Sequence, residues 1–151
     1  MKTFVLTLTI FLSMAPVLLN GEEVEELTRE AIKANKKVIV SVNMKLSDAE
    51  MEKFLPVYDQ YQEALNTLIE KKVELIKDYA AHHKSMSDEK AQDLLTRYLA
   101  INEEKLELKK SFVEKFEKVL TPKQMMRYYQ VENKLEAIVN FKLARDIPLV
   151  R

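Results

Sequence analysis

The chain of 151 residues contains no cysteine and no tryptophan, and only one glycine. Without cysteine it can form no disulfide, no thiolate nucleophile and no thiolate metal site. Because tight turns and phosphate-binding loops depend on glycine, its scarcity argues against an all-β fold and against a nucleotide-binding loop. The formal net charge is zero, so no global field would steer the protein to nucleic acid or to an anionic membrane.

The residues that are present favour helices. Hydrophobic residues make up 47% of the chain, too many for a disordered protein. Much of the remainder is glutamate and lysine, which are good helix formers together with the abundant leucine, alanine and methionine. We therefore expect an all-α protein with a single folded domain.

The N-terminal segment has the pattern of an export signal. An apolar run over residues 4–12 follows one positive charge, and its length fits the hydrophobic core of a signal peptide. A retained membrane anchor is the alternative, but the segment is short for a span, and Ser13 and Pro16 interrupt it. We expect a signal peptide over 1–21, a single helical domain over 22–151, periplasmic localisation and no stable membrane insertion after cleavage.

The first helix is predicted over residues 22–43. Acidic residues crowd its N-terminus, where the helix dipole favours negative charge. Its apolar face is expected to consist of Val24, Leu27, Ala31 and Val38. The β-branched run that begins at Val38 could favour a strand instead.

Two later start signals have the same six-position form. In each, an N-cap hydroxyl and a side chain three residues later can satisfy each other's backbone N–H groups, as in a capping box. A leucine before the cap and a methionine five positions after that leucine stand at hydrophobic-staple positions. The capping residues are Leu46, Ser47, Glu50, Leu120, Thr121 and Gln124.

Long amphipathic segments follow these signals. A heptad-like apolar stripe predicts a helix from Ser47 to about residue 83, with Lys72 as its polar slot and a bend at Pro56. A third helix is expected over 87–119, with Lys105 and Lys115 as polar slots, and a fourth from residue 122.

The expected architecture is all-α, with about four long amphipathic helices in helical hairpins. An apolar tail over residues 147–150 is expected to fold back on the core. Because long thin helices leave apolar faces for a second chain to cover, we also expect a homodimer.

No catalytic, cofactor-binding or metal-binding residues are predicted, and an enzyme is not expected. Gly-rich elbows and His-Glu-x-x-His patterns are absent. Asp78 lies four residues before His82 and could form a two-ligand metal pair, although a helix-end salt bridge is the commoner meaning of that spacing.

Aromatic and methionine side chains on the apolar stripes leave two alternatives open. They are either core residues or an adaptable surface for binding a partner protein, because tyrosine is amphipathic and methionine repacks easily. The candidate partner-binding residues are Phe54, Tyr58, Tyr61, Met125, Tyr128 and Tyr129.

The paired capping boxes after an export signal carry a resemblance. The chain resembles the Spy/CpxP-like periplasmic proteins, which use a Leu-Thr-x-x-Gln motif twice; residues 120–124 match that motif, and residues 46–50 match its chemistry. It also looks like a set of uncharacterised exported helical proteins of Gram-negative bacteria, through residues 75–79 and 130–135 and its Ile-Pro-Leu ending.

The resemblance implies helical dimers that bind unfolded clients without ATP or damp an envelope stress sensor kinase. Our leading hypothesis is therefore a non-enzymatic, chaperone-like stress protein that binds protein clients. The second is a structural or regulatory module that docks on one envelope partner, and the third is a metal-responsive envelope protein that uses Asp78 and His82.

Overall fold

The computed structural model describes residues 35–150. The expected signal peptide and the first part of the expected first helix lie outside these residues. The chain divides into two units, residues 1–37 and 38–151. Residues 35–37 are the described part of the first unit and are helical. The account below concerns the second unit.

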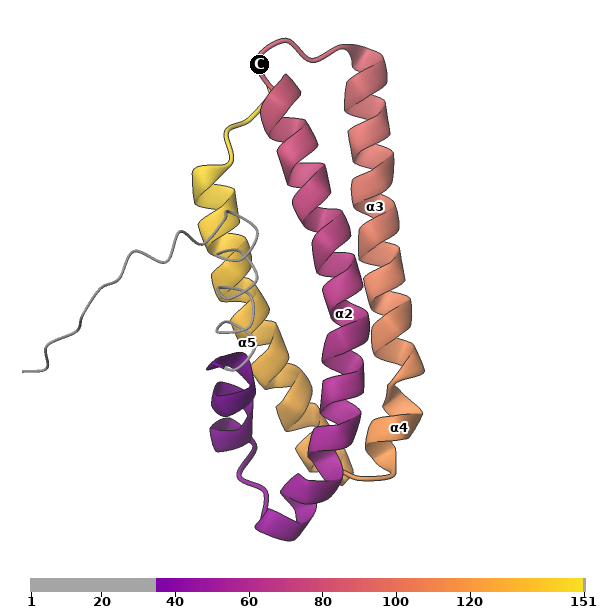
Figure 1. The fold of residues 1–151 in the computed structure, drawn as a ribbon, viewed down its shortest axis with the longest axis vertical. Coiled ribbons are helices and arrows are strands. Elements are labelled where there is room, and N and C mark those ends of the chain that lie inside the picture. The colour runs from indigo at the N-terminus through magenta and orange to yellow at the C-terminus, as the bar shows by residue number, and fades with distance from the viewer. Residues whose placement is uncertain (1–34, 151) are drawn as a thin grey trace, which may run out of the picture. The chain divides into compact units, whose positions relative to one another are not determined.

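Helices make up almost all of the second unit, and no strand occurs among its described residues, which confirms the all-α prediction. After helical residues 38–44 come four further helices (Figure 1). They are α2 (Asp48–His82), α3 (Asp88–Ser111), α4 (Val113–Glu117) and α5 (Pro122–Asp146).

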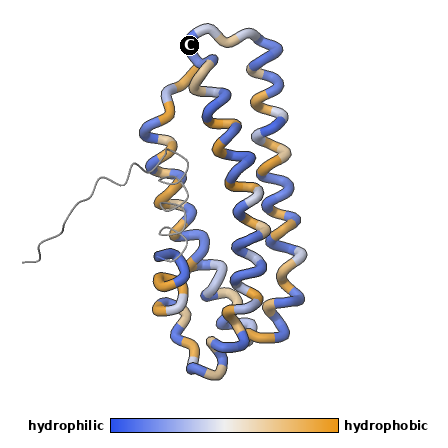
Figure 2. Tube along the Cα trace, viewed as in Figure 1, coloured by the Kyte–Doolittle hydropathy of each residue, from blue (hydrophilic) through white to orange (hydrophobic). Residues whose placement is uncertain are grey.

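Helix α2 is the central element of the unit. It pairs with α3 in a hairpin, while α5 lies on its other side, and α4 links α3 to α5 at one end (Figure 1). Hydrophobic and hydrophilic residues alternate along each helix (Figure 2), as expected when one stripe of a helix is buried.

Both predicted capping boxes are present. The Ser47 hydroxyl accepts a hydrogen bond from the Glu50 backbone N–H, and the Glu50 carboxylate accepts one from the Ser47 N–H at 2.8 Å. The Thr121 hydroxyl and the Gln124 side chain repeat this exchange, also with a 2.8 Å return bond. These boxes set the start of α2 and of α5 where the sequence predicts them.

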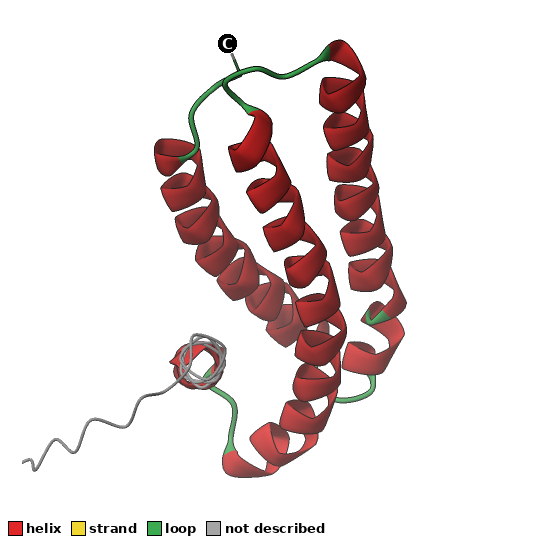
Figure 3. Ribbon diagram, turned by 45° about the horizontal axis from the view of Figure 1, so that its top comes forward, coloured by secondary structure: helices red, strands yellow, loops and turns green. Residues whose placement is uncertain are grey.

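Proline 56 lies inside α2 and has no N–H for the helical bond to residue 52. The helix changes direction in its first turns (Figure 3), which agrees with the bend expected near this residue.

The third predicted helix is divided in two, contrary to the single helix expected over 87–119. At Phe112 the backbone leaves regular helical geometry, with φ −92° and ψ −8°, and its N–H is shared between the carbonyls of Leu108 and Lys110. The break lets both Phe112 and Phe116 reach the core. The predicted polar slot Lys115 lies with its ammonium 4.2 Å from the centre of the Phe112 ring, an attractive cation–π geometry.

The expected apolar face of the first helix is wrong at Val38, which is 61% exposed. Val40 and Met44, which are four residues apart, are buried instead and belong to the core. The β-branched run is helical, because packing of Val40 outweighs its weak preference for a strand.

An aromatic core lies at the end of the unit where α4 joins α3 to α5. The rings of Phe116 and Tyr128 are 4.7 Å apart at its centre, and neither side chain is exposed. The aromatic core consists of Phe54, Tyr58, Tyr61, Phe112, Phe116 and Tyr128. Such tilted and edge-to-face pairs add to the stabilisation from burial alone.

The caps give the first prediction. Thr121→Ala should lower the free energy of unfolding by about 1 kcal/mol, because the Gln124 N–H loses its acceptor. Urea denaturation measures the change, and Thr121→Ser, which keeps the hydroxyl, serves as the control. An Ala variant with the wild-type midpoint would contradict this assignment.

Candidate functional site

The candidate partner-binding residues lie in and around the core. Phe54, Tyr58, Tyr61 and Tyr128 are each 2% exposed or less. Met125 packs against them, and the Tyr129 hydroxyl donates to the Lys109 carbonyl at 3.0 Å. Of the two alternatives, the structure places these four rings in the core, so in this conformation they offer no surface to a partner.

A buried carboxylate faces the tyrosines of the core. Glu132 is 6% exposed, and its Oε1 accepts a hydrogen bond from Gln62 at 3.2 Å. Burial raises the pKa of Tyr128 and Tyr61, and the negative charge of Glu132 raises it further. Both tyrosines therefore remain neutral, and the Tyr128 hydroxyl accepts a hydrogen bond from Gln62 at 3.4 Å.

The two capping boxes contact each other. Gln124 Nε2 donates to Glu50 Oε1 at 2.8 Å, so the residue that closes one box also binds the residue that closes the other. The backbone hydrogen bond from Ser47, followed by the bond from Gln124, lowers the pKa of the Glu50 carboxyl. This link joins the start of α2 to the start of α5, although the two residues are 74 positions apart.

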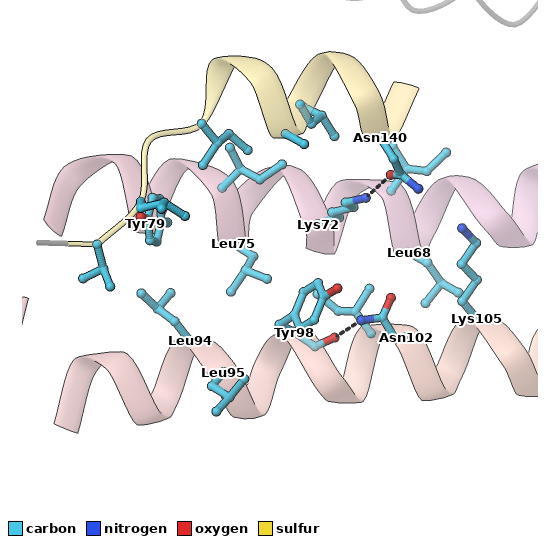
Figure 4. Close-up of a pocket in the computed structure, with 18 of the residues that line it drawn as sticks. Leu68, Lys72, Leu75, Tyr79, Leu94, Leu95, Tyr98, Asn102, Lys105 and Asn140 are labelled. Atoms are coloured by element: carbon cyan, nitrogen blue, oxygen red, sulfur yellow. Dashed lines mark hydrogen bonds between the residues drawn. The ribbon is translucent and has the colours of Figure 1, made fainter. Parts of the chain in front are cut away.

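At the other end of the unit, α2, α3 and α5 surround an open groove of about 890 Å³. Its floor includes Leu68, Leu75 and Leu94, each 8% exposed or less. Figure 4 shows Leu75 of α2 and Leu94 of α3 extending into the space between the two helices. The volume lies in the range of protein ligand sites, and such sites are also lined mainly by apolar side chains.

The rim of the groove is apolar and accessible. Leu95 is 57% exposed and Tyr98 is 49% exposed, and both line the groove from α3. At its far end the Tyr79 hydroxyl donates to the Pro148 carbonyl at 2.6 Å. The tail over residues 147–150 thus folds back onto the end of α2 and lines the groove, with Leu149 88% exposed, and it does not join the aromatic core as the sequence suggests.

Polar side chains meet halfway along the groove. Lys72 Nζ donates to Asn140 Oδ1 at 3.0 Å (Figure 4). Lys105 forms an ion pair with Glu136, whose other oxygen is 3.5 Å from Lys109 Nζ. Burial lowers the pKa of Lys72, and the nearby charge of Lys105 lowers it further, against the opposing effect of Glu136.

The proposed metal pair Asp78 and His82 lies at the hairpin end of α2. The Asp78 carboxylate accepts hydrogen bonds from Lys90 at 2.8 Å and from Arg97. These bonds lower its pKa to about 2, and His82 Nδ1 is 3.1 Å from its other oxygen. The described residues contain no group of three or more potential metal ligands.

The sequence matches no protein-family model, and no curated protein or solved structure matches it. Among the helices of residues 35–150, none combines the length and hydrophobicity that a membrane crossing requires.

Sequence reasoning identified the lysines of the groove but not their partners. Lys72 and Lys105 interrupt apolar series, and the sequence therefore marks them, together with Lys115, as polar slots. Glu132, Glu136 and Asn140 recur every four residues on α5, a spacing that places them on one face. This polar stripe is the signal in the sequence that indicates an inward-facing polar face on α5, and the prediction from apolar periodicity does not include it.

The linked boxes give the second prediction, which concerns pH. Because folding lowers the pKa of Glu50 below its ordinary value of 4.5, its carboxylate stabilises the protein above that pH. The stabilisation is lost as the pH falls through the lowered pKa. In wild type, the urea midpoint should therefore fall more than in Glu50→Gln between neutral pH and about pH 3.5.

The Gln variant keeps the size and the acceptor oxygen of the side chain but cannot titrate. Acid effects that originate elsewhere in the protein are common to both chains and cancel in the comparison. Equal falls in the two urea midpoints would show that the link contributes nothing that depends on the charge of Glu50.

Proposed function

We propose that the protein is a non-enzymatic, ATP-independent chaperone-like protein of the periplasm that shields apolar segments of unfolded clients. The observation that carries the proposal is the open groove with its leucine floor and its exposed Leu95 and Tyr98 rim. Concave sites that bind ligands or protein segments are lined mainly by apolar side chains with a few polar groups at fixed positions, and this groove has that lining. The predicted export signal and the resemblance of the capping boxes to the Leu-Thr-x-x-Gln motif are consistent with the same function.

The shape of the groove supports a polypeptide as its occupant. Its α2 wall runs from Leu65 to Tyr79, a length of about 21 Å at the helical rise. An extended segment of about six residues has that length. The groove is open along this wall rather than closed into a cavity, so a chain could enter from the side without being threaded.

A homodimer is part of the proposal. Apolar side chains that do not line the groove are also exposed, with Leu99 and Leu106 on α3 and Phe141 on α5 each more than half exposed. A second copy could cover them and remove this surface from water. Sedimentation of the purified protein at several concentrations would test this part of the proposal independently.

Docking on one specific envelope partner, for example a sensor kinase, is the second candidate function. The polar side chains fixed halfway along the groove favour it, because polar groups at set positions give a site specificity. Crosslinking in intact envelopes would distinguish the two functions: one dominant adduct fits a dedicated partner, and many unrelated adducts fit a chaperone.

The groove gives the third prediction. The double variant Leu95→Ser/Tyr98→Ser should need at least about tenfold more protein to suppress aggregation of a reduced, unfolded client, because it removes apolar surface that the client would cover. Light scattering of reduced α-lactalbumin measures this suppression.

The control replaces apolar residues of similar exposure outside the groove. Val42 and Met126 are 72% and 62% exposed, and Val42→Ser/Met126→Ser should retain suppression. Since all four residues are exposed, neither double variant should unfold. Wild-type protein that fails to suppress aggregation at equimolar client would reject the chaperone function.

A further inference from the structure

One cation of the groove, Lys72, has no acidic hydrogen-bond partner among the residues that the structure describes. Among residues 35–150, no carboxylate lies within ion-pair distance of the Lys72 ammonium, whose one hydrogen-bond partner is the neutral amide of Asn140. The neighbouring Lys71 does not line the groove and is paired with Glu104 of α3 at 2.5 Å. Of these two lysines, the one without a carboxylate partner among residues 35–150 is the one that lines the groove.

The charges around Lys72 compensate its ammonium only in part, through the nearby Glu136. Glu136 is already shared by Lys105 and Lys109, so three ammonium groups lie near one carboxylate at this point. Partial burial of an ammonium without a counter-ion is unfavourable, and the lowered pKa of Lys72 reflects that cost. A bound carboxylate would supply the missing negative charge.

The position of Lys72 indicates what kind of molecule carries that carboxylate. Lys72 lies seven residues from Leu65 and seven from Tyr79, so apolar wall extends about 10 Å to either side of it. A head-and-tail amphiphile would place its charge at one end of an apolar stretch and fill half of the groove. A polypeptide can place an acidic side chain between two apolar stretches and fill both halves.

We propose that the groove selects polypeptide segments in which one Glu or Asp lies between two apolar stretches, and that Lys72 is the residue that binds the carboxylate. The proposal rests on the polypeptide-binding function proposed above and adds its specificity. Lys72 would release Asn140 or share it, and would gain a charge-assisted hydrogen bond in surroundings partly shielded from water.

The test uses two fluorescent peptides that differ in one residue. Both have two short apolar stretches with Ser-Gly extensions for solubility, and the residue between the stretches is Glu in one and Gln in the other. Fluorescence anisotropy with the purified wild-type protein should give about tenfold tighter binding of the Glu peptide, the effect of one hydrogen bond to a charged group.

Two variants then assign the preference to a residue. Lys72→Met should bind both peptides with the affinity that wild type shows for the Gln peptide. Lys71→Met is the matched control, because it removes the same charge one position away and outside the groove, and it should retain the tenfold preference. Circular dichroism should show both variants folded, since methionine suits the apolar stripe and the exposed position alike.

Several results would overturn the proposal. In one of them, wild type binds the two peptides with equal affinity, and the Leu95→Ser/Tyr98→Ser variant binds both more weakly. That result would leave the groove as a binding site and reject the role of Lys72. A preference that persists in Lys72→Met would place carboxylate recognition elsewhere. Failure to bind either peptide, together with failure to suppress client aggregation, would reject the proposed function itself.

Other occupants of the groove would also be recognised. Dodecanoate that binds in the groove while neither peptide does would assign it to a head-and-tail amphiphile. Peptide binding that appears only when a dimer dissociates would assign the groove to a second copy of the chain. Either result overturns the selection of acidic polypeptide segments.

Discussion

Packing of α5 against α2 through the aromatic core is the interaction on which the rest of the second unit depends. Phe116 and Tyr128 meet at its centre without exposure to solvent, and replacing one such ring with alanine typically costs 3–5 kcal/mol. The break at Phe112 contributes to this packing, because it turns the short helix α4 so that the ring of Phe116 joins the core. The linked capping boxes then hold the starts of α2 and α5 beside it.

The same core explains why the groove lies where it does. At the aromatic end, helical residues 38–44 and α4 both pack with the longer helices, and Val40 and Met44 fill space that three helices would leave empty. At the other end α3 and α5 diverge on either side of α2 (Figures 1 and 3). No fourth helix among the described residues covers that end, so its leucine floor stays open. One end of the unit is therefore closed by packing, and the other remains open.

Local features of this structure could be predicted from sequence, and features that depend on distant packing could not. The boxes at Ser47 and Thr121 were predictable because a cap and its partner are three residues apart and need nothing else. The link between Glu50 and Gln124 joins residues 74 positions apart, and no local pattern indicates it. Periodicity placed the aromatic residues on apolar stripes but could not say which part of a stripe another helix would cover. The break at Phe112 and the position of the groove both depend on which parts of the apolar stripes are covered by another helix.

The lysines of the groove show how a departure from a pattern can mark function. A continuous apolar stripe on α2 would pack more simply, and Lys72 interrupts it at a site where a partly buried ammonium is unfavourable. At Lys105 the neighbouring Glu136 offsets this cost, whereas Lys72 has a neutral amide in the same position. Solubility alone would explain a lysine at both positions, but it would not explain why Lys105 has a carboxylate partner and Lys72 does not. This difference between the two lysines is explained if the carboxylate partner of Lys72 belongs to the molecule that enters the groove. The energetic cost of the partly buried Lys72 ammonium would then be offset when that molecule binds.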